Sequence, residues 1–283
     1  MNAPLTPPAL SDPGARPWRA LDDADLGPAS AVPTMLSPEE RRFYLWLAHH
    51  GVSGRGAIVD LGCFAGGSTA YLAEGARRAG HGRPVHAFDR FRASERVKAD
   101  VLYAAGVAPF EGTNILPLAR DLLAPWSDQI TLHPGPIEAQ TWAGPEIALL
   151  IIDAAKSAAL ADHIAASFFP ALIPGHSIVV QQDFLHWKTP WLPAQMELMS
   201  TCFRPIAHCA PDSVAFLCTQ TPNADALAEG RVTARRDTEL AQALKSMGAR
   251  LTPWDLRPRL ATSLAALKRN PHKRRAKDFT RRP

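Results

Sequence analysis

The sequence predicts a doubly wound α/β protein whose mostly parallel, seven-stranded sheet is closed by an antiparallel C-terminal β-hairpin. Three observations support this fold class. The run Ala57–Leu61 has the pattern of a buried strand and leads through a glycine-bearing turn, 62–67, into a helix, 68–79. A second strand pattern ends in an acid, Asp89. A continuous apolar run ending in an acid, 146–153, is typical of a central parallel strand.

The remaining elements are expected to alternate along the chain. Five β–α repeats should be followed by a hairpin that turns at Pro211 and Asp212. The later elements are expected at 94–105 (helix), 129–134 (strand), 157–172 (helix), 176–183 (strand), 190–201 (helix), 203–210 and 213–219 (hairpin), 235–247 and 259–268 (helices).

The first helix of the body has a clear start signal. Ser37 is expected as its N-cap, Pro38 fits the first helical position, and Glu40 completes a capping box. The helix should end at Gly51. Before it, the Pro- and Ala-rich leader shows no sustained period.

Composition divides the 283 residues into four regions. We expect a disordered leader (1–34), an α/β domain (35–220), a helical extension (221–267) and a flexible basic tail (268–283). The tail holds eight Lys or Arg residues and one acid, so its net charge is +7. The whole chain has a net charge of +4, so residues 1–267 together carry −3. A loose contact with a polyanion is the most that such a tail implies.

The compartment is read from what the sequence lacks. It has no apolar run of about 18 residues, and its start lacks the basic and apolar segments of a secretory signal. Cys63, Cys202, Cys209 and Cys218 do not have metal-ligand spacing. We therefore expect reduced thiols in a cytoplasmic protein that does not enter the membrane.

Glycine spacing in the first turn distinguishes between ligands. A pyrophosphate-binding turn needs glycines in the pattern GxGxxG, whereas Gly62 is followed by glycine only at Gly66 and Gly67. Asp60, just before the loop, would repel a pyrophosphate and attract a cation. A ligand with a ribose, an adenine and a positively charged amino-acid tail suits this loop better.

The stretch Asp60–Ser68 (DLGCFAGGS) resembles motif I of class I S-adenosyl-L-methionine-dependent methyltransferases. It is most similar to the catechol O-methyltransferase-like and macrocin O-methyltransferase-like branches, and the resemblance extends over roughly 36–220. It implies a Rossmann-like fold and O-methylation of a small-molecule acceptor.

The resemblance also implies a cofactor site at the carboxyl ends of the parallel strands. There Asp89 would bind the ribose, the loop after the third strand would approach the adenine, and motif I would hold the methionine end. The cofactor-binding residues expected are Asp60, Gly62, Cys63, Phe64, Ala65, Gly66, Gly67, Ser68, Asp89, Pro136, Ile137 and Asp153.

Catalytic candidates follow the fourth and fifth strands. Asp153 and Lys156 match the Asp-x-x-Lys spacing of the catechol branch, in which the acid binds a divalent metal and the lysine is the base. His186 is a second candidate base. Lys156 could equally be a surface lysine, and His186 could belong to a solvated loop. Trp187 and Trp191 could line an acceptor pocket or make ordinary core contacts.

A divalent metal is doubtful on the same comparison. Both branches carry an Asp-Asp or Asp-Asn pair after the fifth strand, but this chain has Gln181 and Gln182 there, and Asp183 one place later. Neutral amides are poor ligands for a hard dication. Asp153 and Asp183 are the remaining candidates for a metal site if the register shifts by one residue.

Two other functions stay open. The basic tail allows an RNA methyltransferase, although no Pro-Pro-Tyr or Pro-Cys sequence follows the fourth strand. The Gln181–Gln182 pair allows a non-catalytic S-adenosylmethionine-binding protein. A dinucleotide oxidoreductase is disfavoured by the glycine spacing.

Overall fold

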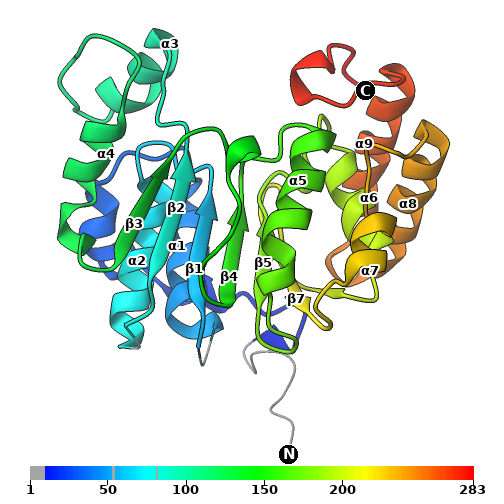
Figure 1. Cartoon of the computed structure of the whole chain (residues 1–283), viewed down its shortest axis with the longest axis horizontal. Helices are drawn as coiled ribbons and strands as arrows, with labels where there is room; N and C mark the ends of the chain where they lie inside the picture. Colours follow the sequence, from blue (N-terminus) through cyan, green and yellow to red (C-terminus); the bar gives the residue numbers. More distant parts are fainter. Residues whose placement is uncertain (1–9, 53–54, 81) are drawn as a thin grey trace, which may run out of the picture.

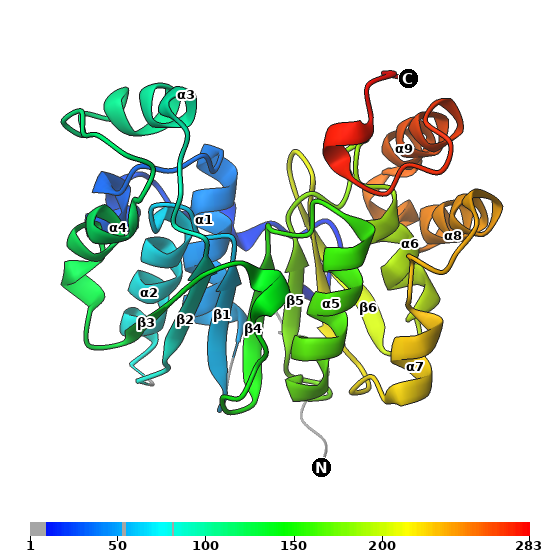
Figure 2. The ribbon, with the colours of Figure 1, turned by 45° about the horizontal axis from the view of Figure 1, so that its top comes forward.

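The computed structural model describes residues 10–52, 55–80 and 82–283. These residues form a seven-stranded sheet in the order β3-β2-β1-β4-β5-β7-β6, with helices on both faces (Figures 1 and 2). Strands β1 to β5 run parallel, and β7 pairs antiparallel with both β5 and β6. The predicted α/β class with its closing hairpin is therefore confirmed.

The strand bounds lie close to those expected. The strands are β1 Ala57–Leu61, β2 Val85–Asp89, β3 Ile130–Pro134, β4 Ile147–Ile152, β5 Ile178–Gln181, β6 Phe203–Cys209 and β7 Ser213–Cys218. The α-helices are α1 Pro38–Trp46, α2 Gly67–Ala79, α3 Glu95–Val97, α4 Leu116–Leu122, α5 Ala158–Phe168, α6 Trp191–Leu198, α7 Ala224–Glu229, α8 Asp237–Arg250 and α9 Arg257–Arg269. Helices α4 and α7 were not predicted, and α1 ends at Trp46 and continues to Gly51 as a π-helical turn.

The central strands are buried on both faces. Successive side chains of β4 alternate between two cores: Leu150 and Ile152 pack with α5, α6 and α8, whereas Leu149 and Ile151 pack with α1 and α2. All six residues of β4 are buried. A strand covered on both sides needs a continuous apolar run, which is why 146–153 was recognisable in the sequence.

The leader is not disordered over residues 10–34, contrary to our expectation. Trp18 is fully buried beside Phe43 of α1, with ring centroids 4.6 Å apart, and its indole N–H donates to Glu39. Leu26 and Val32 join the same core. A few widely spaced apolar side chains therefore anchor this segment, and such spacing produces no periodic signal. The predicted capping box of Ser37 and Glu40 is confirmed.

The basic tail is docked as well, so the expected flexible arm at 268–283 is wrong. Asn270 is buried, and its side chain exchanges hydrogen bonds with the backbone of Arg281, which closes 270–281 into a loop. Phe279 is only 1% exposed and packs against Trp191. We call residues 270–281 the C-terminal strap. It lies at the same end of the molecule as the carboxyl ends of the parallel strands (Figure 1).

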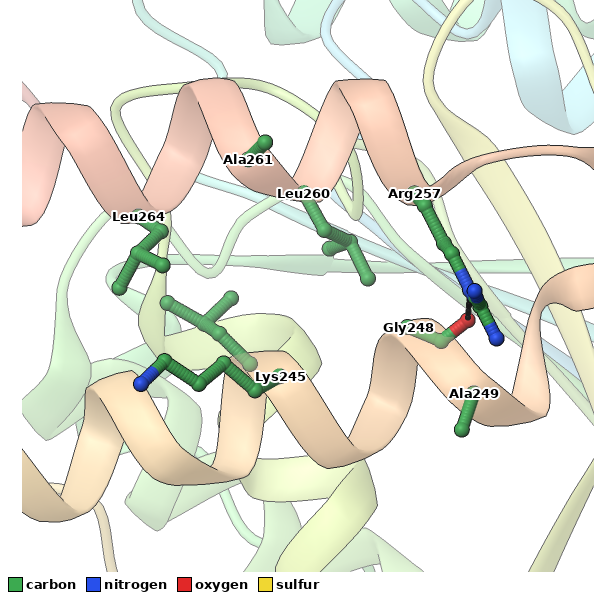
Figure 3. Close-up of a pocket in the computed structure, with 8 residues that line it drawn as sticks. Lys245, Gly248, Ala249, Arg257, Leu260, Ala261 and Leu264 are labelled. Atoms are coloured by element: carbon green, nitrogen blue, oxygen red, sulfur yellow. Dashed lines mark hydrogen bonds between the residues drawn. The ribbon is translucent and has the colours of Figure 1, made fainter.

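The helical extension packs on α6 and has a groove of its own. Helices α8 and α9 enclose a hollow of about 320 Å³, which Leu260 and Leu264 line from α9 (Figure 3). At one end Arg257 donates to the carbonyl oxygen of Gly248 (3.4 Å). The residues that line this hollow all lie in 244–264, outside the loops that follow the parallel strands.

Candidate active site

The loop between β1 and α2 has the backbone that its glycines predict. Gly62 and Gly66 have positive φ angles of 102° and 97°, in the region that favours glycine. Gly66 is the N-cap of α2 and has no capping side chain. Cys63 and Ala65 are buried beneath the loop, which leaves its backbone as the surface that a ligand would approach.

Asp60 supports this loop from below. It is fully buried, and its Oδ2 accepts hydrogen bonds from the hydroxyl groups of Ser68 and Thr69, both at 2.7 Å. Its Oδ1 is buried without a hydrogen-bond partner among the described residues. Burial raises the pKa of Asp60 to about 6, against the two hydroxyl donors that lower it. A buried carboxylate with one unpaired oxygen is suited to a cationic ligand.

Asp89 is the last residue of β2, and its carboxylate stabilises the two turns that contain Phe64 and Phe91. Its Oδ2 accepts the backbone N–H of Phe64 (2.9 Å), and its Oδ1 accepts that of Phe91 (2.7 Å). Phe64 and Phe91 both have positive φ, which is uncommon outside glycine. The carboxylate therefore shapes the cofactor loop directly, and each oxygen keeps a lone pair for a ligand hydroxyl.

The loop after β3 adjoins Asp89 at the same edge of the sheet. Gly135 donates its N–H to the carbonyl oxygen of Asp89 (2.9 Å), and Pro136 then begins a short helical turn. Ile137 is buried in that turn. Asp60, Asp89, Pro136 and Ile137 thus gather where the parallel strands end, as predicted.

A small cavity lies on the loop and is covered by the leader. Its lining comprises Pro33, Thr34, Met35, Leu36, Gly62, Cys63, Phe64, Gly67, Ser68, Asp153 and Gln182. At about 30 Å³ it holds roughly one water molecule. Thr34 and the carbonyl of Pro33 abut Gly67 closely, since a Cβ at Gly67 would lie 2.5 Å from the Thr34 Cβ. The leader segment 33–36 therefore packs directly over the loop.

Lys156 lies between two carboxylates. Its Nζ is 2.6 Å from Oδ1 of Asp153 and also donates to Oδ2 of Asp183. Burial raises the pKa of Asp153 to about 7, although Lys156 lowers it. Burial alone would lower the pKa of Lys156, but the two carboxylates outweigh it and raise that pKa. Lys156 is therefore held as an ammonium, which argues against its predicted role as the base.

The two glutamines do not complete a metal site. Gln181 is buried, with its Nε2 near the sulfur of Met196 (3.7 Å). Oε1 of Gln182 accepts a 2.6 Å hydrogen bond from the buried hydroxyl of Tyr44 on α1. Within the described ranges, no three His, Cys, Asp or Glu side chains are grouped to hold a metal ion. The residues do not fit the divalent metal that the resemblance implies.

The other catalytic candidates lie in the loop after β5. His186 is partly buried; its Nδ1 accepts the N–H of Lys188 (3.4 Å), and its ring stacks on Trp187. Trp191 is fully buried and donates its indole N–H to the carbonyl oxygen of Ala155 (3.0 Å). Trp191 thus makes the core contact that was the alternative to a pocket wall, and no described hydrogen bond joins His186 to Lys156.

Sequence reasoning missed three parts of this site. Tyr44, the leader segment 33–36 and the C-terminal strap all reach it from outside the β–α repeats. The strap pairs with the segment after β4: Ala276 donates to the carbonyl of Lys156, and Ala158 donates to that of Arg274, both at 2.9 Å. The capping box predicted where α1 begins, but no signal in the sequence showed that Tyr44 would reach the site.

No protein-family model matches the sequence, and the search of curated proteins found no match. Similar solved structures include "the O-methyltransferase NovP" (14% identity, 66% of this chain and 82% of that chain, TM-score 0.49). They also include "cofactor-bound Rv0187 from MTB" (17% identity, 72% of this chain and 90% of that chain, TM-score 0.47). A third is the "SAH-bound Podospora anserina methyltransferase PaMTH1" (18% identity, 87% of this chain and 79% of that chain, TM-score 0.38). Since these identities and TM-scores are low, we base the function on this chain's own residues.

Described helices include none that is both long and apolar enough to cross a membrane. All four cysteines are buried and free.

Proposed function

We propose that this chain is a class I S-adenosylmethionine-dependent methyltransferase that methylates a hydroxyl group of a small molecule. The observation that carries the proposal is the unpaired, buried Oδ1 of Asp60 beneath a glycine loop, with Asp89 at the end of the next strand. The sheet order is also the one that the resemblance implies.

The residues present fit this cofactor. The carboxylate of Asp60 suits its ammonium group, directly or through a water, and Asp89 can accept hydrogen bonds from a ribose diol. The bare amides of the loop, where Gly66 and Gly67 have no side chains, allow close approach. Because the present cavity is so small, binding requires segment 33–36 to move away from Gly67.

When bound, S-adenosylmethionine supplies an electrophilic methyl group on a sulfonium. The chain then has to orient the acceptor oxygen and accept its proton. Asp153, with a pKa raised to about 7, is suited to take that proton near neutral pH. The ammonium of Lys156 beside it can stabilise negative charge on the acceptor oxygen. His186 remains a candidate base.

Calorimetry with S-adenosylmethionine, its demethylated product and NAD tests the proposal. We expect the first two to bind and NAD to bind more weakly or not at all. Tighter binding of NAD would contradict a methyltransferase. Binding without turnover on a panel of sugar, phenol and polyketide alcohols would favour a non-catalytic cofactor-binding protein instead. The docked strap gives no support to a free RNA-binding arm.

A further inference from the structure

Two carboxylates converge on one ammonium at the carboxyl edge of the sheet. Asp153 directly follows β4, and Asp183 lies just beyond β5, the neighbouring parallel strand. Both contact the Nζ of Lys156. Two acids brought together in this way repel each other unless a cation lies between them. In this chain the cation is a side chain of the chain itself.

The backbone around Lys156 is fixed on several sides. Its carbonyl accepts from Ala276 of the strap (2.9 Å), and the N–H of Ala158 donates to Arg274 (2.9 Å). The carbonyl of Ala155 accepts from the buried indole of Trp191 (3.0 Å). The Lys156 side chain is half exposed, and an ion pair of an ordinary surface lysine contributes little to stability. Here, however, hydrogen bonds fix the backbone on both sides of Lys156, so the position of its side chain is defined by the fold.

The strap is itself anchored to the extension. Arg274 pairs with Asp237 at the start of α8 (2.7 Å), and the N–H of His272 donates to the same carboxylate (2.7 Å). Phe279 packs against Trp191. The region after 221 thus has a structural connection to the lysine at the candidate active site.

The residues beside Asp153 and Asp183 are poor further ligands for a metal, because neutral amides bind a hard dication weakly. Oε1 of Gln182 is bound by the Tyr44 hydroxyl, and Gln181 is buried, with its Nε2 near the sulfur of Met196 and its Oε1 unpaired among the described residues. A divalent magnesium or calcium ion requires about six oxygen ligands. Asp153 and Asp183, the two acids that contact Lys156, are already bound to its ammonium.

We propose that the ammonium of Lys156 takes the place of a divalent cation between Asp153 and Asp183, which makes acceptor activation independent of metal. The inference rests on the proposed function and deepens it. The acceptor oxygen forms a bond to the methyl carbon while the carbon–sulfur bond breaks, and the electron pair stays on sulfur. The hydroxyl proton passes to the Asp153 carboxylate, and Lys156 keeps its protons while donating a hydrogen bond to the acceptor oxygen. The step needs no further reactant.

Manganese binding to the full-length protein, measured by electron paramagnetic resonance without other ligands, tests the inference. The unaltered protein should show no specific binding. Lys156→Ala frees both carboxylates, and Lys156→Ala with Gln182→Asp adds a third ligand. Since the opposing charge is removed, manganese should bind these variants at least ~10-fold more tightly than the unaltered protein. Lys245→Ala on α8 is the matched control and should behave like the unaltered protein.

Two outcomes would overturn the inference: specific manganese binding to the unaltered protein, or no gain in either Lys156 variant that keeps a cooperative melting transition. Lys156→Met, which conserves side-chain volume, serves as the alternative if the alanine variant does not fold. S-adenosylmethionine calorimetry runs in parallel on the same samples. If that ligand fails to bind while the manganese pattern appears, the proposed function fails and the internal cation stands.

Discussion

The backbone N–H of Ala276 donates a hydrogen bond to the carbonyl oxygen of Lys156 (2.9 Å), which joins the basic C-terminal strap to the candidate active site. A segment that sequence composition marks as a free arm is therefore part of the architecture around Lys156. Its buried contribution comes from two residues, Asn270 and Phe279.

Ending the chain after Leu267 should lower the melting temperature by several degrees, because it removes Phe279 and exposes its contact with Trp191. Phe279→Ala should account for much of the loss, since truncation of a buried Phe costs about 3–5 kcal/mol. Lys277→Ala, exposed in the same strap, is the control and should leave the melting temperature unchanged. An unchanged melting temperature in the truncated chain would show that the strap is not docked in solution.

Asp60 should make stability depend on pH in the acidic range. Its pKa is about 6 in the folded chain and 3.8 ordinarily, so between these values the folded state binds more protons than the unfolded state. Stability should therefore fall as pH rises through this window, by up to about 3 kcal/mol. Asp60→Asn should flatten this slope in denaturant unfolding measured from pH 4 to 7.

The same variant should lose affinity for S-adenosylmethionine. A cationic amino group favours the charged form of Asp60, so the affinity of the unaltered protein should increase as pH rises through about 6. Asp60→Asn should bind more weakly at pH 8 and lack this increase. If both proteins bind equally at pH 8, Asp60 does not contact the cofactor.

The sequence predicted the elements whose signals are local. The buried run of β4, the glycine loop after β1 and the capping box at Ser37 each depend on residues close together in the chain. All were found where expected. The prediction that Asp60 and Asp89 lie at one edge followed from the rule that ligands bind at the carboxyl ends of parallel strands, and the observed strand order, in which β1 and β2 are neighbours, agrees with it.

The parts that were missed depend on contacts between distant segments. Trp18 reaches Phe43, Tyr44 reaches Gln182, and Phe279 reaches Trp191. Trp18 and Phe279 are single large side chains in segments of otherwise polar or irregular composition, and Tyr44 bonds to a residue 138 positions along the chain, so average hydropathy and periodicity could not reveal these contacts. The cluster of Lys156 with Asp153 and Asp183 also joins two separate segments, those after β4 and β5. It was therefore not predicted, although each of its three residues had been named as a candidate.

Gly67→Ala should disturb the leader rather than the helix. Gly67 does not have a positive φ, so the cost of an added methyl group comes from steric clashes and not from backbone strain. The new Cβ would lie 2.5 Å from the Thr34 Cβ and 2.7 Å from the Pro33 carbonyl oxygen. We expect a destabilisation of about 1–3 kcal/mol, typical of overpacking. Gly248→Ala in α8 is the control: an added Cβ would lie 3.7 Å from Cγ of Arg257, an ordinary van der Waals contact, so the variant should be neutral or slightly stabilising. Equal effects of both would contradict close packing of segment 33–36 on the loop.

Asp89 can be tested with two substitutions that separate its structural and ligand-binding roles. Asp89→Ala removes both acceptors from the amides of Phe64 and Phe91, so it should destabilise the loop and weaken S-adenosylmethionine binding by about 1.5–3 kcal/mol. Asp89→Asn keeps one acceptor oxygen and the side-chain shape, so it should lose less stability. Its affinity should still fall, because the charged acceptor for the ribose diol is gone. Calorimetry and thermal melting on both variants give the comparison. If Asp89→Asn retains full affinity while Asp89→Ala loses it, Asp89 acts only by holding Phe64 and Phe91, and its ribose role is wrong.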